Sequence, residues 1–572
     1  MSRTDTLTVP AGRDEPALPE ARTAPLDAAG LRSPAQEPDV RDFELPAGGL
    51  DDGQRLRALD TMDAYLTSKR RYLLGYQATQ EMGGSAFDLG RFMHHNINNL
   101  GDPFQSGGYK PNTKVVERAV LDYYAALWHA KGPYDAADPE SYWGYVLSMG
   151  STEGNMYALW NARDYLSGKA LIQPPAATPD GTPRYLRAAA EPGNPNAHRP
   201  VAFYSEDTHY SFAKAVHVLG VETFHAVGTE QYPDECPLAA PTAAQSPAWP
   251  AEVPSRKGPS GHTWDGTGEI DIDALAVLVE FFAAKGHPIF VSLNLGSTFK
   301  GAHDDVREVC ERLLPIFEKH GLIRSEVAYG KDPSTGEPLT DLRRRFWIHV
   351  DGALGAGYAP FLRMAAADPA GFDWAPDTTL PEFDFGVTLP TREFGDVDMV
   401  SSIAMSGHKW PGAPWPCGIY MTKVKYQISP PSQPEYIGAP DTTFAGSRNG
   451  FSPLILWDHL SRHSYRDQVD RIRRAQELAA YLEQQLRLLE LEKDIELWPA
   501  RTPGAITVRF RKPSPELVAK WSLSSQDVLL VPGDERTRRS YVHVFLMSSV
   551  DRAKLDELLA DLGNDYAVLG RG

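Results

Sequence analysis

The sequence predicts an α/β protein with a mostly parallel sheet. From about residue 114, helical patterns alternate with short runs of β-branched and aromatic residues, an alternation typical of βαβ units. At 572 residues the chain is too long for a single compact core, so we expect one large domain with smaller parts attached. The predicted strands comprise residues 201–204, 288–293, 346–350 and 399–404.

The N-terminal part of the chain contains two kinds of sequence. Residues 1–45 are rich in Pro, Ala, Asp and Glu and show no apolar period, which predicts a disordered tail. A helical spacing of leucine and methionine begins near residue 51, and a turn-rich aromatic stretch follows over 75–108. We therefore expect residues 46–113 to form an N-terminal arm on a large domain of residues 114–446.

The last 126 residues predict a small α+β domain, residues 447–572. Its pattern consists of one long helix over about 454–494, strands at 505–510 and 541–546, and a terminal helix from about 550. The large domain also carries Pro-, Ala- and Gly-rich insertions, which we expect on the surface because loops of that length are rarely part of a core. These insertions cover about 171–200, 229–267 and 365–395.

The composition excludes several classes of protein. With 57 Lys+Arg against 75 Asp+Glu the net charge is −18, and the basic residues are scattered, so neither nucleic acid nor an anionic membrane is an expected partner. Three widely separated cysteines, Cys236, Cys310 and Cys417, fit neither a disulfide framework nor a thiolate zinc site. The N-terminus lacks the apolar core of a secretory signal, so the expected location is the cytoplasm.

A lysine follows the last predicted strand of the large domain. The segment Ser406-Gly407-His408-Lys409-Trp410 leads into a turn-rich stretch, where α/β folds place ligands, at the carboxyl edge of the sheet. An isolated lysine at such a position is usually a solvated loop residue. Its interpretation therefore depends on what the other strand ends carry.

An acid ends the strand at 346–350. Asp351 is followed by Gly352 and Ala353. An Asp at this position can be only a helix cap or a turn former. The functional alternative is a partly buried acid that pairs with a cationic nitrogen of a cofactor.

Three further junctions carry small polar residues. The segment Ser148–Asn155 opens a helix with hydroxyl groups, which can form either a plain capping box or a phosphate cradle of free backbone N–H groups. His209 follows the strand at 201–204, and Ser297 and Thr298 follow the strand at 288–293. A lone histidine is more often a packing or surface residue than a cofactor contact.

Taken together, these junctions strongly resemble the group II amino acid decarboxylases that depend on pyridoxal 5'-phosphate (PLP), which have fold type I. The motifs that carry the resemblance are Ser-Gly-His-Lys, His-Val-Asp-Gly-Ala and Gly-Ser-Thr-Glu-Gly-Asn. The likeness covers about residues 70–570 and is strongest to bacterial PLP histidine decarboxylases and to actinobacterial valine and methionine decarboxylases.

The resemblance implies a role for each motif residue. Lys409 would form the Schiff base with the cofactor aldehyde, Asp351 would pair with the pyridine nitrogen, and His209 and Ala353 would lie on opposite ring faces. Ser447, in the segment 446–450, would reach the phosphate of a partner subunit, so a homodimer with shared active sites is implied. The remaining cofactor contacts implied are Ser151, Thr152, Ser406 and His408 at the phosphate and Thr298 near the ring hydroxyl.

The resemblance also implies a loop tyrosine that closes over the active site and supplies a proton at the substrate Cα. Tyr436 matches that position, in Ser432-Gln433-Pro434-Glu435-Tyr436. Tyr426 lies close by in the sequence and is the alternative, and a surface aromatic without a catalytic role is also possible.

The arm over 76–104 resembles the stretch that lines the substrate side-chain pocket in the family. It contains aromatic and amide residues but no Arg/Lys cluster for a second carboxylate, which favours a neutral side chain over glutamate. We expect L-methionine as the substrate, with valine or leucine next and histidine behind. The predicted pocket residues are Gln77, Gln80, Phe92, Asn98 and Phe104, with His94, Asn96 and Asn99 in the same stretch.

Other functions stay open at this point. The same cofactor constellation can serve transamination or a retro-aldol lyase, since the reaction depends on which Cα bond is perpendicular to the ring. A catalytically silent dimeric scaffold is the alternative outside enzymes. No metal is expected, because His94 and His95 lack further ligands at a recognisable spacing.

Overall fold

The computed structural model describes residues 38–80, 82, 88–172, 184–238, 248–332, 335–427, 435–530 and 534–569. The chain divides into two compact units, Met1–Leu73 and Leu74–Gly572. Residues 1–37, most of the predicted tail, lie outside the described part. In the first unit a 3-10 helix, η1 (Val40–Phe43), precedes α1 (Asp52–Arg71), which begins with a capping box between Asp51 and Gln54.

The second unit is built on a seven-stranded sheet in the order β1-β13-β12-β9-β6-β4-β5. Every neighbouring pair from β12 to β5 is parallel, which confirms the predicted mostly parallel α/β fold. The strands are β1 (Tyr142–Leu147), β4 (Val201–Phe203), β5 (Glu222–Thr223), β6 (Ile289–Asn294), β9 (Phe346–Asp351), β12 (Val400–Ser406) and β13 (Gly418–Lys423).

Strands β1, β5 and β13 were not predicted from the sequence. β13 runs antiparallel to both β12 and β1. The connection 407–417 between β12 and β13 consists of turns and bends without a helix, whereas a parallel return needs a crossover of a dozen or more residues, usually a helix. The antiparallel direction fits this connection, and the apolar pattern alone does not reveal it.

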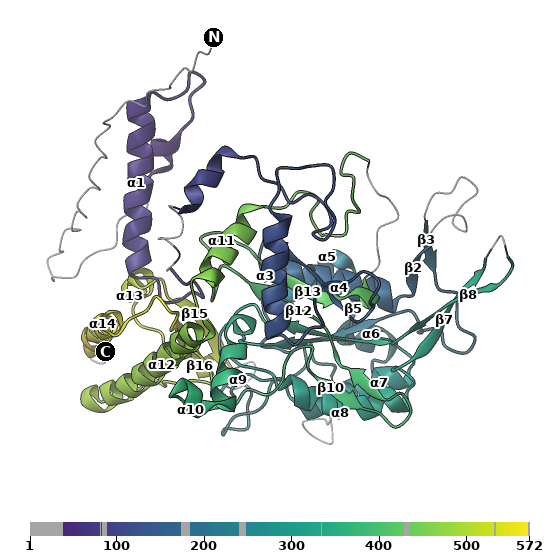
Figure 1. Ribbon diagram of the computed structural model, residues 1–572. Helices are drawn as coiled ribbons and strands as arrows, with labels where there is room; N and C mark the ends of the chain where they lie inside the picture. Colours follow the sequence, from purple (N-terminus) through teal and green to yellow (C-terminus); the bar gives the residue numbers. More distant parts are fainter. Residues whose placement is uncertain are drawn as a thin grey trace, which may run out of the picture. The chain divides into compact units, whose positions relative to one another are not determined.

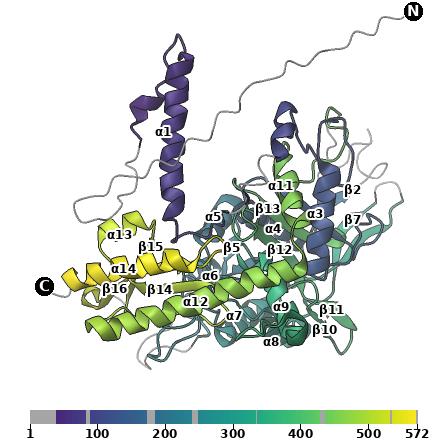
Figure 2. The ribbon, with the colours of Figure 1, turned by 60° about the vertical axis from the view of Figure 1, so that its left-hand side comes forward.

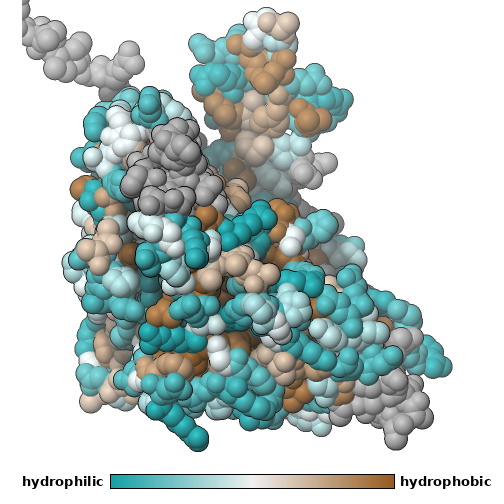
Figure 3. All heavy atoms as spheres, turned by 90° about the vertical axis from the view of Figure 1, so that its right-hand side faces the viewer, coloured by the Kyte–Doolittle hydropathy of each residue, from teal (hydrophilic) through white to brown (hydrophobic). Residues whose placement is uncertain are grey.

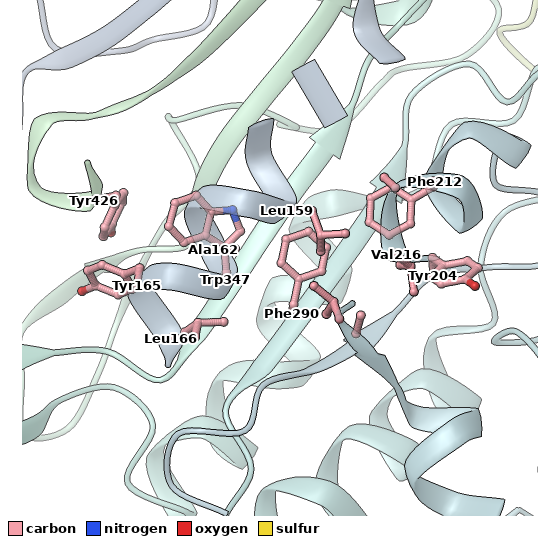
Figure 4. Close-up of a cluster of buried hydrophobic side chains, with 13 residues drawn as sticks. Leu159, Ala162, Tyr165, Leu166, Tyr204, Phe212, Val216, Phe290, Trp347 and Tyr426 are labelled. Carbon is pink, nitrogen blue, oxygen red and sulfur yellow. The ribbon is translucent and has the colours of Figure 1, made fainter. Parts of the chain in front are cut away.

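Helices cover both faces of this sheet (Figure 1). On one face, α4 (Ser151–Leu166) and α5 (Tyr210–Leu219) pack on the strands through a buried cluster that includes Leu159, Phe212 and Trp347 (Figure 4). Phe346, the neighbour of Trp347 on β9, points to the opposite face of the sheet, where it stacks on Phe317 with ring centroids 4.4 Å apart. Helices α7 (Ile272–Ala284) and α8 (Val306–Lys319) lie on this second face.

The C-terminal part contains two helices where the sequence pattern predicts one. α11 (Phe451–Ser461) ends before α12 (Tyr465–Lys493), because Ser464 and Asp467 form a capping box that starts a new helix. An antiparallel sheet in the order β14-β16-β15 follows, in which β15 was not predicted. Its elements are β14 (Thr507–Arg511), α13 (Pro515–Lys520), β15 (Ser524–Leu529), η5 (Glu535–Thr537), β16 (Arg538–Phe545) and α14 (Arg552–Leu569), which lies along α12 (Figure 2).

The second unit also contains several shorter helices and strands. Two hairpins, β2–β3 and β7–β8, project side by side (Figures 1 and 2), and the Ala189 N–H donates to the Ala328 carbonyl at 2.7 Å. Parts of two predicted insertions, 173–183 and 239–247, lie outside the described residues. The elements are η2 (Gly90–His94), α3 (Lys114–Leu127), β2 (Lys169–Ile172), β3 (Arg184–Arg187), α6 (Phe224–Gln231), β7 (Ser325–Lys331), β8 (Pro338–Arg343), η3 (Gly355–Gly357), α9 (Ala359–Ala367), α10 (Pro369–Phe372), β10 (Thr388–Pro390), β11 (Asp396–Asp398) and η4 (Val424–Tyr426).

The face of the molecule in Figure 3 carries many hydrophilic residues. On the face in Figure 3, teal hydrophilic residues surround smaller brown hydrophobic groups. Among the described residues, no helix has the length and apolar character needed to cross a membrane.

Candidate active site

A cavity of about 250 Å³ lies at the carboxyl ends of the sheet strands. All the junctions singled out in the sequence meet there, because parallel strands end at the same edge of a sheet. Nine predicted cofactor residues line this cavity: Ser151, Thr152, His209, Thr298, Asp351, Ala353, Ser406, His408 and Lys409.

Lys409 lies in the turn after β12. Its backbone carbonyl accepts a hydrogen bond from the Thr79 N–H at 3.3 Å, while Nζ has no hydrogen-bond or ion-pair partner among the described residues. Part of the side chain faces the cavity, yet burial lowers the pKa of Lys409 to about 8, against the opposing effect of Asp351. A lysine amine that deprotonates this readily is suited to attack a carbonyl.

Asp351 is the last residue of β9 and is 6% exposed. Its Oδ2 accepts a hydrogen bond from Asn155 Nδ2 at 2.7 Å, and its Oδ1 accepts one from the Ala353 N–H at 3.2 Å. These donors fix the carboxylate at the cavity wall. An acid in this position can hold a protonated ring nitrogen.

The start of α4 forms an anion cradle. The N-cap residue Gly150 has φ +73° and no side-chain cap, and a Cβ there would lie 2.6 Å from His408 Cε1. The Ser151 N–H donates to Ser406 Oγ at 3.0 Å, and the Ser406 hydroxyl donates to Ser151 Oγ at 3.1 Å. An uncapped 16-residue helix that starts among hydroxyl groups fits a phosphate.

His209 is held as a neutral ring at the start of α5. Its Nδ1 lies 2.7 Å from Ser211 Oγ and accepts a bond from the Ser211 N–H at 3.3 Å. Burial lowers the pKa of His209, and the nearby charge of Lys409 lowers it further. A neutral, fixed imidazole is suited to packing against a flat cofactor ring.

The structure also adds residues that the sequence analysis missed. Asn155 lies one helical turn after Ser151, so the i, i+4 spacing could have placed both on the cavity side of α4. Asn294, at the end of β6, donates from Nδ2 to Ser205 Oγ and Thr208 Oγ1, both at 3.1 Å. The other lining residues are Met149, Ser211, Gly296, Ser297 and Pro416.

Several predicted residues do not line the cavity of this single chain. Ser447 is exposed, and its Oγ accepts a hydrogen bond from Asn98 Nδ2 at 3.0 Å. Phe104 stacks on Tyr134 with centroids 3.8 Å apart. Gln77 is buried, Gln80 donates from its N–H to Ser549 Oγ at 3.2 Å, and Phe92 is part of η2.

The two candidate tyrosines lie in different environments. Tyr436 is 78% exposed and does not line the cavity. Tyr426 is buried in the cluster of Figure 4, and its hydroxyl donates to Asp398 Oδ2 at 2.9 Å. Tyr426 is therefore a core residue, not a residue of the cavity.

The chemistry of this cavity defines a class of protein. A desolvated lysine, an acid, a neutral histidine and an anion cradle fit the aldehyde, ring nitrogen, ring face and phosphate of PLP, and the fold is that of fold type I enzymes. Within the described part of the chain, no group of three or more His, Cys, Asp or Glu residues could hold a metal ion.

Comparisons with known proteins identify the family. The structure matches L-methionine decarboxylase from Streptomyces sp. 590, crystallised with L-methionine methyl ester, at 76% identity over 94% of this chain and 99% of that one, with a TM-score of 0.88. Histidine decarboxylase from Mesorhizobium japonicum is 27% identical over 84% of this chain and 94% of its own length. The chain belongs to the group II PLP-dependent amino acid decarboxylases. The predicted family, the PLP cofactor and the decarboxylase type of reaction are therefore confirmed.

Two further results complete the comparison. Glutamate decarboxylase from Lactobacillus brevis is 16% identical with a TM-score of 0.58 over 94% of this chain, which shows a shared fold only. No family model matches this chain.

Proposed function

We propose that this protein decarboxylates L-methionine to 3-methylthiopropylamine and CO₂. The observation that carries the proposal is the 76–77% identity, over 94% of the chain, to an enzyme that has been crystallised with L-methionine methyl ester and with 3-methylthiopropylamine. The histidine and serine decarboxylase relatives share only 24–28% identity with this chain. Valine and leucine rank next as substrates because they are also neutral and apolar, and histidine ranks behind them.

Bound PLP supplies an aldehyde for the substrate amine and a protonated pyridine ring that accepts the electron pair left when CO₂ departs. Lys409 would provide the amine that holds the cofactor. Asp351 would hold the proton on the ring nitrogen, and the hydrogen bonds that it accepts from Asn155 and Ala353 keep its carboxylate oriented for that task. His209 would pack on one ring face, and the small Ala353 would leave room on the other.

The phosphate end anchors the cofactor. Ser151, Thr152 and Ser406 offer hydroxyl groups beside the start of α4, and His408 closes the cradle. Thr298 lies across the cavity and would contact the ring hydroxyl and the substrate carboxylate. These contacts fix the ring plane, which decides which Cα bond is broken.

We propose a homodimer in which the two subunits complete each other's sites. The residues proposed to act on the substrate, Tyr436 and the arm, do not line the cavity of one chain, and neither does Ser447. In the dimer, Ser447 would reach the partner's phosphate and Tyr436 would close over the site and return a proton to Cα. Gln77, Gln80, Phe92, Asn98 and Phe104 would line the side-chain pocket. We place the enzyme in the cytoplasm, in keeping with its free buried cysteines.

The deciding experiment is an amine-production screen over the twenty amino acids. L-Methionine should give 3-methylthiopropylamine and CO₂ in equal amounts, at a kcat/KM above that for valine, leucine or histidine. A higher value for histidine would refute the substrate assignment, and keto acid in place of amine would indicate transamination. Protein that shows no cofactor absorption after addition of PLP would indicate an inactive scaffold.

A further inference from the structure

A chain of buried hydrogen bonds leads from the protein core to Asp351. Trp347 Nε1 donates to Ser402 Oγ at 2.9 Å, and that oxygen lies 2.9 Å from His349 Nδ1. His349 Nε2 lies 3.0 Å from Asn155 Oδ1, and Asn155 Nδ2 donates to Asp351 Oδ2 at 2.7 Å. Trp347, Ser402 and His349 are fully buried, Asn155 is 1% exposed, and Figure 4 shows Trp347 within the core cluster.

The fold brings these groups together for simple geometric reasons. Trp347, His349 and Asp351 alternate along β9, so all three side chains lie on the face that α4 covers. Ser402 is the register partner of His349 on β12. Asn155 reaches down from α4 and connects the histidine to the acid.

The Asp351 end of the chain sets the direction of the hydrogen bonds that lead to it. A carboxylate only accepts, so Asn155 must face Asp351 with its NH₂ group and turn Oδ1 toward His349. Asn155 Oδ1 then requires a proton on His349 Nε2. A neutral ring with its proton on Nε2 has a bare Nδ1. Ser402, which accepts from the Trp347 indole, then offers its own proton to Nδ1, although the Ser402 backbone carbonyl beside the ring could accept from the opposite tautomer.

A neutral imidazole satisfies both contacts. Burial lowers the pKa of His349 to about 4, so the ring is uncharged at neutral pH and carries one proton. The opposite tautomer would put that proton on Nδ1 and turn the Asn155 amide over. Asn155 Oδ1 would then face Asp351 Oδ2, acceptor against acceptor, and the carboxylate would lose its shortest donor.

We propose that Ser402 and His349 are positioning residues that fix the Asn155 amide so that it donates to Asp351. They act by locking His349 in the Nε2–H tautomer, and they never touch the cofactor. The proposal rests on the role of Asp351 given above, since its effect is to keep the carboxylate oriented toward the ring nitrogen. Consecutive hydrogen bonds that point the same way also polarise one another.

Ser402→Ala tests this coupling, with Ser401→Ala as the matched control. Ser401 is the next residue on β12 and equally buried, but its Oγ accepts from Arg344 Nη2 and the Ile348 N–H and has no place in the chain. In Ser402→Ala the Asn155 amide is no longer held as a donor to the Asp351 carboxylate. This loss should raise the PLP dissociation constant by about tenfold to a hundredfold. Ser401→Ala should keep the wild-type constant, and Ser402→Thr, which retains the hydroxyl, should recover it.

A direct measurement uses ¹⁵N NMR of the holoenzyme labelled at histidine, with His349→Gln to assign the signal. The wild type should show a protonated Nε2 and a bare Nδ1 at His349. A protonated Nδ1, or a cationic ring, would overturn the proposal, and this result decides the matter even if Ser402→Ala fails to fold. Equal PLP affinity in folded Ser402→Ala and Ser401→Ala would also overturn it.

Asp351→Asn separates this proposal from the one on which it rests. Wild-type PLP affinity and turnover in that variant would refute the pairing of Asp351 with the ring. A loss of affinity in Asp351→Asn, combined with an unchanged Ser402→Ala, would refute only the coupling through His349.

Discussion

Glu117→Gln should destabilise the protein because it breaks a buried ion pair. Glu117 and Arg448 are 0% and 3% exposed, and their side chains are in direct contact. Glu117 also accepts hydrogen bonds from Asn99 Nδ2 at 2.8 Å and from the Val146 N–H at 2.9 Å. This one carboxylate therefore joins the arm, α3, β1 and the segment that carries Ser447.

The expected cost follows from the charges left behind. The amide introduced by Glu117→Gln has one carbonyl oxygen, so it would accept from only one of Asn99 and Val146 and turn its NH₂ group toward the other donor. It would also remove the ion-pair partner of the buried Arg448, and breaking a buried pair in this way costs about 3–5 kcal/mol. Lys114, whose pKa burial and then Arg448 lower to about 8, would also lose an anionic neighbour. With an unfolding entropy of about 2.1 cal/mol/K per residue, the unit Leu74–Gly572 should lose roughly 3–5 °C in Tm.

Thermal unfolding followed by circular dichroism at a fixed scan rate measures the shift. Asp138→Asn is the control, because it breaks a pair with Lys131, at 2.5 Å, that is partly open to solvent, and it should leave Tm within about 1 °C of wild type. Adding Arg448→Met to Glu117→Gln should recover at least half of the loss by removing the stranded charge. If Glu117→Gln alone unfolds within about 1 °C of wild type, the reasoning is refuted.

The remaining predictions concern the site and one core ion cluster. Lys409→Ala should abolish both the visible absorption of covalently bound PLP and measurable turnover; turnover at wild-type rates would remove Lys409 from the mechanism. Asp351→Asn should still bind PLP at saturating concentration yet lose turnover by roughly a hundredfold or more, measured as kcat. Tyr436→Phe should slow amine release and raise the yield of aldehyde by-product, and full activity without by-product would contradict its role. Burial would raise the pKa of Asp398, but the charges of Arg344, Lys423 and Lys425 outweigh burial and hold that pKa well below its usual range. The ionised Asp398 therefore stabilises the folded protein above pH about 4, and this contribution is lost as the pH falls below that value. The Tm difference between wild type and Asp398→Asn should therefore be constant from about pH 5 to 7 and shrink below about pH 4; a difference that grows in acid would contradict this sign.

The sequence was sufficient for the fold class and for most of the cavity. Each strand end carried a residue type suited to one part of PLP, and a parallel sheet gathers those ends at one edge. The family resemblance of these motifs assigns Lys409, Asp351 and His209 to one site, and all three line the same cavity. The comparisons confirm the cofactor and the family.

Other features depended on local competition that an apolar pattern does not record. The break between α11 and α12 comes from the capping box at Ser464, which interrupts a helical period that is otherwise continuous. The antiparallel direction of β13 fits the connection without a helix after β12. The resemblance favours Tyr436 as the loop tyrosine and leaves Tyr426 as the alternative, and burial places Tyr426 in the core while Tyr436 is exposed.

By itself the sequence determined which chemical groups follow the strand ends, because apolar runs mark the strands and the residues after each run can be read directly. Only the tertiary structure decided what holds those groups in place. Asn155, His349 and Ser402 come from a helix and two strands far apart in the chain, and their hydrogen bonds exist only because α4 packs across β9 and β12. Pairwise packing over long sequence distances sets such contacts, so the residues that tune the acid became visible only in the folded molecule.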